Sequence, residues 1–237
     1  MAELPKSLED AIVQSRLATQ TAIADGLTLL QVELLFPEIK VMPVAVQFIP
    51  ALDHFGAQLK IFFPDAGAAA LARRDWGETP YKIMDIGTSK TGVERKIQPE
   101  DEAFLLISPT AVEVVQVEQI ANAVGVRPLI MLNPRLEDAG TVGIGYAARQ
   151  TRTRFLSTIE SCYYLRPVDD ETALFRCYPE PWQVWVEKEG DYQKIAELPK
   201  KPSGDELDEI LMKPGAAPGK KPGVFVGLQR FLRALSN

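Results

Sequence analysis

The chain has 237 residues, 46% of them hydrophobic, which is enough for one sizeable core and for one or at most two domains. Its formal net charge of −6 argues against a general nucleic-acid binder, because such proteins normally present a basic surface. No basic amino-terminal segment leads into an apolar run, as a signal peptide would require. The most apolar region, residues 41–52, is interrupted by Pro43 and Pro50 and is too short to cross a bilayer. We therefore expect a cytoplasmic protein without a transmembrane segment, which can still lie peripherally on a membrane.

In chain order, the first part alternates predicted helices and strands. Residues 4–25 carry an amphipathic stripe that predicts a helix. Residues 27–36 alternate in period two, which predicts a strand with Gln31 and Glu33 on the face opposite its apolar side chains. Helices are then predicted at 44–55 and 68–76, and strands at 59–63 and 81–86.

Residues 102–138 read as a strand, a crossover helix and a second strand. The two strands are the apolar runs 103–107 and 129–132. Between them Thr110 and Glu113 have the spacing of a capping box, and Gly125 is placed to end the helix. Because parallel strands need such a crossover, this unit predicts a parallel sheet covered by helices.

The last third of the folded part is rich in strands. After a predicted helix at 145–156, period-two segments at 159–167, 172–178, 182–187 and 192–198 predict antiparallel hairpins. The fold class that follows is α/β, a three-layer sandwich with a mostly parallel central sheet extended by C-terminal antiparallel hairpins. We expect a single domain over 1–198, a Pro/Gly/Lys-rich linker over 199–223 and a basic amphipathic helix over 224–237.

Polar residues that follow the predicted parallel strands form one candidate ligand site. Ligands of open α/β sheets bind at the carboxyl ends of the strands, where a small phosphate or carboxylate could meet Arg135 and a helix start. The candidates are Asp65, Ser108, Thr110, Asn133 and Arg135. The alternative, which we favour, is that they act as helix caps and turn formers, since strand ends need such residues.

No catalytic constellation stands out. His54 is the only histidine, and no G-x-S-x-G elbow is present. Residues 143–148 match the letters of a dinucleotide fingerprint but follow a predicted loop instead of a strand, so a turn into a helix is the favoured interpretation. One histidine and two cysteines are too few for a His/Cys metal cluster. We expect no cofactor, no metal and a non-catalytic protein.

The two cysteines suggest a hypothesis about redox chemistry. If Asp169 and Asp170 form a two-residue hairpin turn, Cys162 lies directly opposite Cys177 on the neighbouring strand. A non-hydrogen-bonded pair of this kind is close enough for a disulfide. The favoured alternative is two buried, reduced thiols, because cytosol-like compartments keep thiols reduced.

The C-terminal segment combines an apolar stripe with basic residues. The side chains expected to contact a partner or a membrane are Phe225, Leu228, Arg230, Phe231, Leu232 and Arg233. A basic amphipathic helix on a linker can lie on an anionic bilayer or fill a partner's groove. Docking onto the protein's own core remains equally open.

Several runs carry a resemblance to a known family: LPKSLEDAIVQSRLATQTAIADG, LQVELLFPEIK, FFPDAGAAALARRDWG and LIMLNPRLEDAGTVGIGYAARQ. The chain resembles, over residues 4–186, a cyanobacterial and chloroplast family with a domain of unknown function. That family includes the low photosystem II accumulation protein three and a domain attached to a chloroplast adenylate kinase. The resemblance implies a role in photosystem II assembly at the cytoplasmic or stromal face of thylakoids, and supplies no catalytic residues.

Two functions are therefore expected from the sequence. The first is a non-catalytic accessory or assembly factor that contacts photosystem assembly proteins or the thylakoid membrane surface, with candidate surface residues Tyr146, Arg149, Trp182 and Trp185. The second is an enzyme or sensor that binds a small phosphate- or nucleotide-like ligand at the strand ends.

Overall fold

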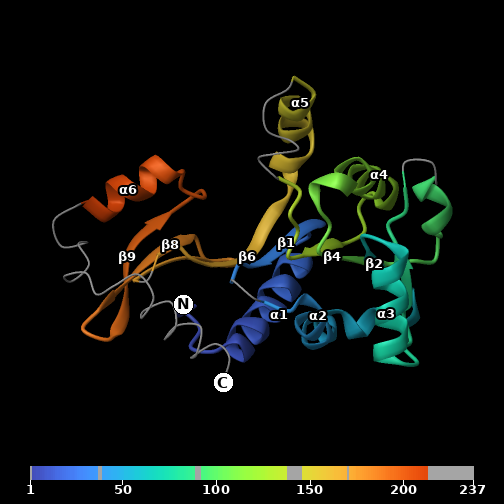
Figure 1. The fold of residues 1–237 in the computed structure, drawn as a ribbon, viewed down its shortest axis with the longest axis horizontal. Coiled ribbons are helices and arrows are strands. Elements are labelled where there is room, and N and C mark those ends of the chain that lie inside the picture. Colours follow the sequence, from blue (N-terminus) through green and yellow to red (C-terminus); the bar gives the residue numbers. More distant parts are fainter. Residues whose placement is uncertain (1, 37–38, 89–91, 138–145, 170, 213–237) are drawn as a thin grey trace.

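A nine-stranded sheet runs through the molecule in the order β3-β2-β4-β5-β1-β6-β7-β8-β9 (Figure 1). The computed structural model describes residues 2–36, 39–88, 92–137, 146–169 and 171–212. The strands are β1 Leu29–Leu34, β2 Leu59–Phe63, β3 Lys82–Asp85, β4 Ala103–Ile107, β5 Leu129–Leu132, β6 Glu160–Pro167, β7 Thr172–Cys177, β8 Trp182–Lys188 and β9 Asp191–Leu198. All pairings among strands β1, β2, β3, β4, β5 and β6 are parallel. The pairs β6–β7, β7–β8 and β8–β9 are antiparallel.

Helices cover both faces of this sheet, so the predicted α/β sandwich with a parallel centre and antiparallel C-terminal hairpins is confirmed (Figure 1). The α-helices are α1 Leu8–Ala24, α2 Val41–Phe48, α3 Ala66–Trp76, α4 Val114–Val124, α5 Tyr146–Arg154 and α6 Gly204–Met212. Short 3-10 helices are η1 Ile49–Gln58, η2 Val93–Lys96, η3 Ala111–Glu113 and η4 Leu156–Thr158.

Local capping chemistry fixes where the helices begin and end. The Asp65 carboxylate accepts the backbone N–H of Ala68 at 2.9 Å, which caps α3. The predicted capping box is present. The Thr110 hydroxyl accepts the backbone N–H of Val112, and the Glu113 carboxylate accepts the backbone N–H of Thr110. Gly125, with φ of 65°, ends α4 as predicted.

One face of the sheet has a continuous core, and the other face has two separate ones. On the first face, α1, α2, η1 and α3 pack over apolar side chains such as Leu30, Val32 and Leu34 of β1. On the second face, α4 packs over β2, β4 and β5, whereas α6 packs over β7, β8 and Tyr164 of β6. The stretch of β1 and β6 between these two clusters carries polar side chains, and the candidate site lies there.

The predicted register of the β6–β7 hairpin is wrong by one residue. Val168 donates its backbone N–H to Thr172 O at 2.8 Å, so Tyr163 and not Cys162 lies opposite Cys177. The loop is therefore longer than a two-residue turn. Cys162 itself is the extra residue of a bulge, because Gln31 of β1 pairs with Ser161 and the next β1 residue pairs with Tyr163.

Part of the predicted linker is a packed helix. α6 occupies 204–212 and buries Leu207 against β8 and Tyr164, so these residues do not behave as a linker. Residues 213–223 and the predicted terminal helix 224–237 lie outside the described residues. The predicted partner or membrane contacts there are Phe225, Leu228, Arg230, Phe231, Leu232 and Arg233. In the part of the chain that is described, no helix is long and apolar enough to cross a membrane.

A buried ion pair ties β2 to the segment that leads into β4. Lys60 Nζ lies 2.6 Å from Asp101 Oδ2, and the two side chains are 3% and 2% exposed. Lys60 also donates to the carbonyl of Lys96, and Asp101 accepts the backbone N–H of Gln98. The charges are therefore paired and hydrogen-bonded, which is the condition for burying them.

We predict that Asp101→Ala destabilises the protein by about 3–5 kcal/mol, because it leaves the Lys60 ammonium buried without its counterion. The exposed pair Arg74–Asp75 supplies a matched control, and Asp75→Ala should cost less than about 1 kcal/mol. Urea unfolding of the three proteins measures both effects. Equal destabilisation by the two substitutions would contradict this account.

Candidate functional site

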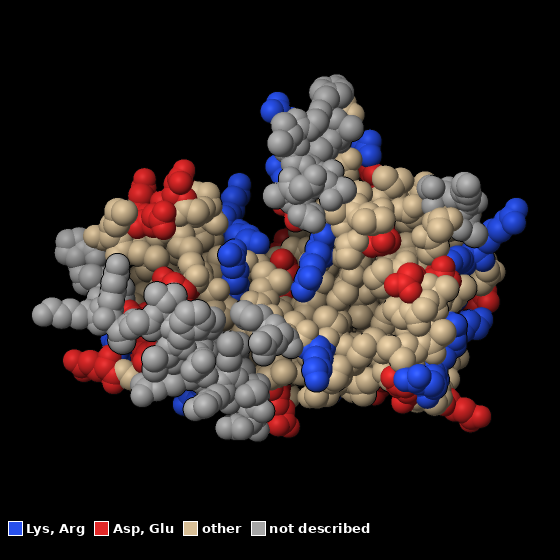
Figure 2. All heavy atoms as spheres, viewed as in Figure 1, with Lys and Arg blue, Asp and Glu red and all other residues tan. Residues whose placement is uncertain are grey.

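A cleft of about 790 Å³ lies over β1 and β6, between the segment that begins α4 and the segment that leads to α6. It is lined by Gln31, Glu33, Leu35, Thr110, Ala111, Val112, Pro134, Arg135, Leu136, Glu137, Leu156, Ile159, Tyr164, Arg166 and Lys201. Figure 2 shows the hollow between α6 and the α4–α5 side, with basic side chains around it and acidic atoms deeper in. The volume is within the range of small-molecule sites, although the lining is more polar than is usual for them.

Glu33 is the buried acid of the cleft. It lies on β1, is 8% exposed, and its Oε2 accepts hydrogen bonds from Gln31 Nε2 at 2.9 Å and Ser161 Oγ at 3.1 Å. Burial raises the pKa of this carboxyl above its ordinary value of 4.5, against an opposing attraction from Lys201. Both of these hydrogen bonds end on Oε2, and Glu33 is among the residues that line the cleft.

Three basic side chains line the same cleft from three different segments. Arg135 follows β5, Arg166 lies near the end of β6, and Lys201 precedes α6. Among the described residues none of the three takes part in an ion pair. Lys201 Nζ instead lies 4.1 Å from the centroid of the Tyr164 ring, a cation–π contact that holds it beside the cleft.

The predicted strand-end residues divide into two groups. Thr110 and Arg135 line the cleft, and a parallel bridge joins their backbones. Asp65 does not line it, because its carboxylate caps α3. Thr110 is also committed to its cap, since its hydroxyl donates to Glu113 Oε2 at 2.7 Å. Asp65 therefore acts only as a helix cap in the described structure, whereas Thr110 is a helix cap that also lines the cleft.

Ser108 and Asn133 shape the backbone at the ends of β4 and β5. Both have positive φ, 50° and 48°, a conformation that few residues other than glycine adopt. Asn133 Oδ1 accepts the backbone N–H of Leu34 at 2.7 Å, which extends the pairing of β5 with β1. The Ser108 hydroxyl is buried without a hydrogen-bond partner among the described residues. Neither side chain lines the cleft.

Sequence reasoning missed the centre of the cleft. Gln31 and Glu33 were placed on the polar face of their strand, yet no function followed from that placement. Arg166 and Lys201 were not singled out. The available signal was a pair of polar side chains on one face of a strand that lies inside a parallel sheet, where both faces are normally apolar.

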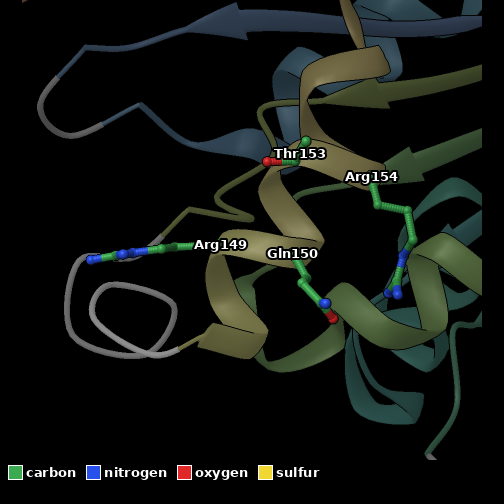
Figure 3. Close-up of a pocket in the computed structure, with 4 residues that line it drawn as sticks. All are labelled: Arg149, Gln150, Thr153 and Arg154. Carbon is green, nitrogen blue, oxygen red and sulfur yellow. The ribbon is translucent and has the colours of Figure 1, made fainter.

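A second hollow, of about 550 Å³, lies along α5 and is lined by Arg149, Gln150, Thr153 and Arg154 (Figure 3). Figure 3 shows Arg149 and Arg154 pointing to opposite sides of the helix. Arg154 reaches α4, where its guanidinium makes two bonds to the Glu118 carboxylate at 2.6 and 2.7 Å. Arg154, the charged lining residue on the α4 side, is thus already paired with Glu118. This hollow is therefore a weaker candidate for a ligand site than the cleft over β1 and β6.

The three described side chains of the expected surface patch, those of Arg149, Trp182 and Trp185, do not support it. Trp182 is 3% exposed and packs under α6, so it is a core residue. Trp185 packs against the core on the opposite face of the sheet, and its Nε1 donates to Gln183. Arg149 is exposed on α5, away from both. The side chain of Tyr146 lies outside the described residues.

The two cysteines are buried and free. Cys162 Sγ lies 3.6 Å from Thr19 Oγ1 and 3.4 Å from Gln31 O, so it packs against α1 and β1. Burial raises the pKa of Cys162 to about 12 and that of Cys177 to about 11. Because the thiolate is the reactive form, both thiols are chemically quiet in the folded protein.

The fold and the cleft define an α/β protein with an open, charged pocket beside its central strand. The family model described as Domain of unknown function (DUF1995) matches residues 5–209, and the chain belongs to this family. The match confirms the expected domain-of-unknown-function family. It extends beyond the expected end at residue 186, through β9 and into α6. No solved structure matches the chain.

We predict that neither thiol of the folded protein reacts with Ellman's reagent at about pH 8, because almost no thiolate forms there. Unfolding in guanidinium should expose both groups to fast reaction. Cys162→Ser and Cys177→Ser variants assign the signal to each position. Fast reaction of either thiol without unfolding would contradict the burial described here.

A second prediction concerns Glu33 and pH. Because the pKa of the Glu33 carboxyl is raised in the folded protein, this carboxyl stays protonated at pH values where it is already ionised in the unfolded chain. The protonated carboxyl therefore contributes stability that is fully present below about pH 4.5. That contribution is lost as the pH rises through the folded-state pKa. Glu33→Gln carries no charge and should become more stable relative to the natural protein across that window. Urea unfolding at several pH values measures the difference.

The matched control is Glu137→Gln, at an exposed glutamate that lines the same cleft and pairs with Arg152. Water solvates that carboxylate in both states, so its substitution should give a smaller gain, limited to the repulsion that its charge exerts on Glu33. A stability difference for Glu33→Gln that stays constant between about pH 4 and pH 8 would overturn the prediction.

Proposed function

We propose that this protein is a non-catalytic accessory factor that aids photosystem II biogenesis at the thylakoid surface through protein contacts. The biological setting rests on the resemblance described above, and the family to which the chain belongs is consistent with it. Support from the structure comes from one observation, an apolar edge at the mouth of the cleft. A partner segment that packs on this edge would lie beside the charged pocket.

Val112 and Val115 form this partner edge. Val112 is 76% exposed and Val115 is 54% exposed, and they lie three residues apart at the start of the η3–α4 segment. Residues at this spacing are neighbours on a helix surface. Single exposed apolar side chains are common, whereas these two are neighbours and one of them, Val112, lines the cleft, which favours an interaction surface.

The edge also has a polar surround suited to a reversible complex. Val112 lines the cleft together with Arg135, whereas the cap formed by Thr110 and Glu113 holds the backbone of the edge in place. An apolar centre beside charged residues is the usual composition of a non-obligate interface. The rigid cap means that little order has to be gained on binding, which favours association.

We predict that Val112→Asp/Val115→Asp abolishes capture of photosystem assembly proteins from solubilised thylakoid membranes. Aspartate in the first turns of a helix is compatible with the helix dipole, so the fold should survive. The matched control is Val126→Asp, at a valine that is 87% exposed just beyond α4. Quantitative mass spectrometry of the captured proteins provides the measurement.

The expected result is loss of the photosystem subunits with the double variant and their retention with the control. Thermal unfolding of both variants confirms that they are folded. If folded Val112→Asp/Val115→Asp captures the same subunits as the natural protein, the partner edge is not the contact surface. If the natural protein captures no photosystem subunit, the proposed setting itself is wrong.

A further inference from the structure

The charged cleft has an imbalance that the accessory role does not explain. Arg135, Arg166 and Lys201 contribute three positive charges without an ion-pair partner in the described part of the chain. Glu137, the other acid of the lining, already pairs with Arg152 at 3.2 Å. Among the described lining residues, Glu33 is the one acid left to oppose the three cations, so the described lining balances at most one of the three charges and two remain.

From this arrangement we propose that the cleft is a binding site for a small phosphate monoester that carries a hydroxyl group. The phosphate dianion balances the two remaining charges between Arg135, Arg166 and Lys201, and the ligand's hydroxyl donates to Glu33 at the floor. Arginine and lysine are the side chains that recognise phosphate in proteins. The site goes beyond the partner contacts proposed above and does not depend on them.

The basic groups come from elements that the fold holds rigidly. Arg135 follows β5 directly and its backbone N–H donates to Pro109 O at 2.7 Å, and Arg166 lies within β6 opposite Leu174. Lys201 is held over the Tyr164 ring. The backbone is therefore fixed at both arginines and the Lys201 side chain is held by the ring, so an anion that enters the cleft meets three cations whose attachment points do not move.

Glu33 is suited to the hydroxyl and not to the phosphate. Its Oε2 is occupied by Gln31 and Ser161, and its remaining oxygen can accept a hydrogen bond from a ligand. An ionised carboxylate would repel a phosphate placed against it, so the phosphate is expected nearer the arginines. A ligand with a phosphate and a hydroxyl a few atoms apart satisfies both ends of the cleft.

The apolar lining sets the size of the ligand. Leu35, Leu156, Ile159 and Tyr164 also line the cleft, and its volume of about 790 Å³ is within the range of small-molecule sites. Two sources supply the required chemistry, a free hydroxylated phosphate monoester and a lipid headgroup that carries a monoester phosphate beside free hydroxyls, such as that of phosphatidylinositol 4-phosphate. The second would present the headgroup from a membrane surface.

Titration calorimetry of the full-length chain with glycerol 3-phosphate at low ionic strength tests the site. We expect saturable binding that Arg135→Gln/Arg166→Gln weakens by about tenfold or more for each arginine lost. The control Arg74→Gln/Arg149→Gln removes the same charge from two exposed arginines outside the cleft and should bind like the natural protein. Lys201→Gln provides a third, independent test of the cleft.

The vesicle arm separates the two sources. Sedimentation with vesicles of phosphatidylcholine that contain phosphatidylinositol 4-phosphate is compared with sedimentation with pure phosphatidylcholine. Retention that is lost in Arg135→Gln/Arg166→Gln supports the lipid headgroup, whereas glycerol 3-phosphate binding without retention supports the free ester.

Three results would overturn the site. They are the absence of both kinds of binding, equal loss in the two arginine pairs, and arginine-dependent binding of an oligoglutamate peptide without binding of glycerol 3-phosphate. The last would mark the cleft as a surface for acidic proteins. Because partner capture is tested separately with Val112→Asp/Val115→Asp, either proposal can fail while the other stands.

Discussion

The two faces of β1 are chemically different, and the rest of the structure depends on that difference. β1 lies inside the sheet, parallel to β5 on one side and β6 on the other. Leu30, Val32 and Leu34 enter the core under α1, whereas Gln31 and Glu33 face the opposite side. An interior parallel strand is normally apolar on both faces because helices cover both. Here α4 and α6 each cover only part of the second face, so the polar side of β1 lies at the bottom of the cleft between them (Figure 1).

The ends of the parallel strands are occupied by the fold itself. In open α/β sheets the crevice at the strand ends is where ligands usually bind. In this protein Asn133 uses its side-chain oxygen to bind the backbone of β1, and Asp65 and Thr110 use theirs to start helices. Those polar groups are satisfied within the chain and have little capacity left for a ligand. The Ser108 hydroxyl is the exception at the strand ends, since it has no partner among the described residues. The cations without an ion-pair partner in the described part of the chain, Arg135, Arg166 and Lys201, line the cleft that holds Glu33.

The sequence predicts most of the fold because most of the elements are determined locally. The runs 59–63, 103–107 and 129–132 match β2, β4 and β5, and the capping box at Thr110 has its expected partners. The β6–β7 register depends on loop length and on the bulge at Cys162, which is imposed by pairing with β1 far away in sequence, so local patterns did not predict it. The packing of α6 and the gathering of Arg166 and Lys201 beside Glu33 are likewise products of distant contacts. A linear pattern shows the polar face of a strand, but not which segments leave that face uncovered.

Glu33 is difficult to explain as a contribution to stability. A carboxylate at this depth loses most of its hydration, and its raised pKa shows that two hydrogen bonds and the attraction of Lys201 do not fully compensate. An apolar residue of similar size would join Leu35 and Tyr164 in the adjacent cluster without that cost. Buried ionisable groups that weaken the fold and line a pocket are characteristic of functional sites. The three cations around the same pocket repel one another, which is a second unfavourable feature at the same place. An anion would relieve the repulsion among the three cations, and its hydroxyl would give the Glu33 carboxylate a further hydrogen-bond donor. A binding site explains this arrangement more simply than the requirements of folding do.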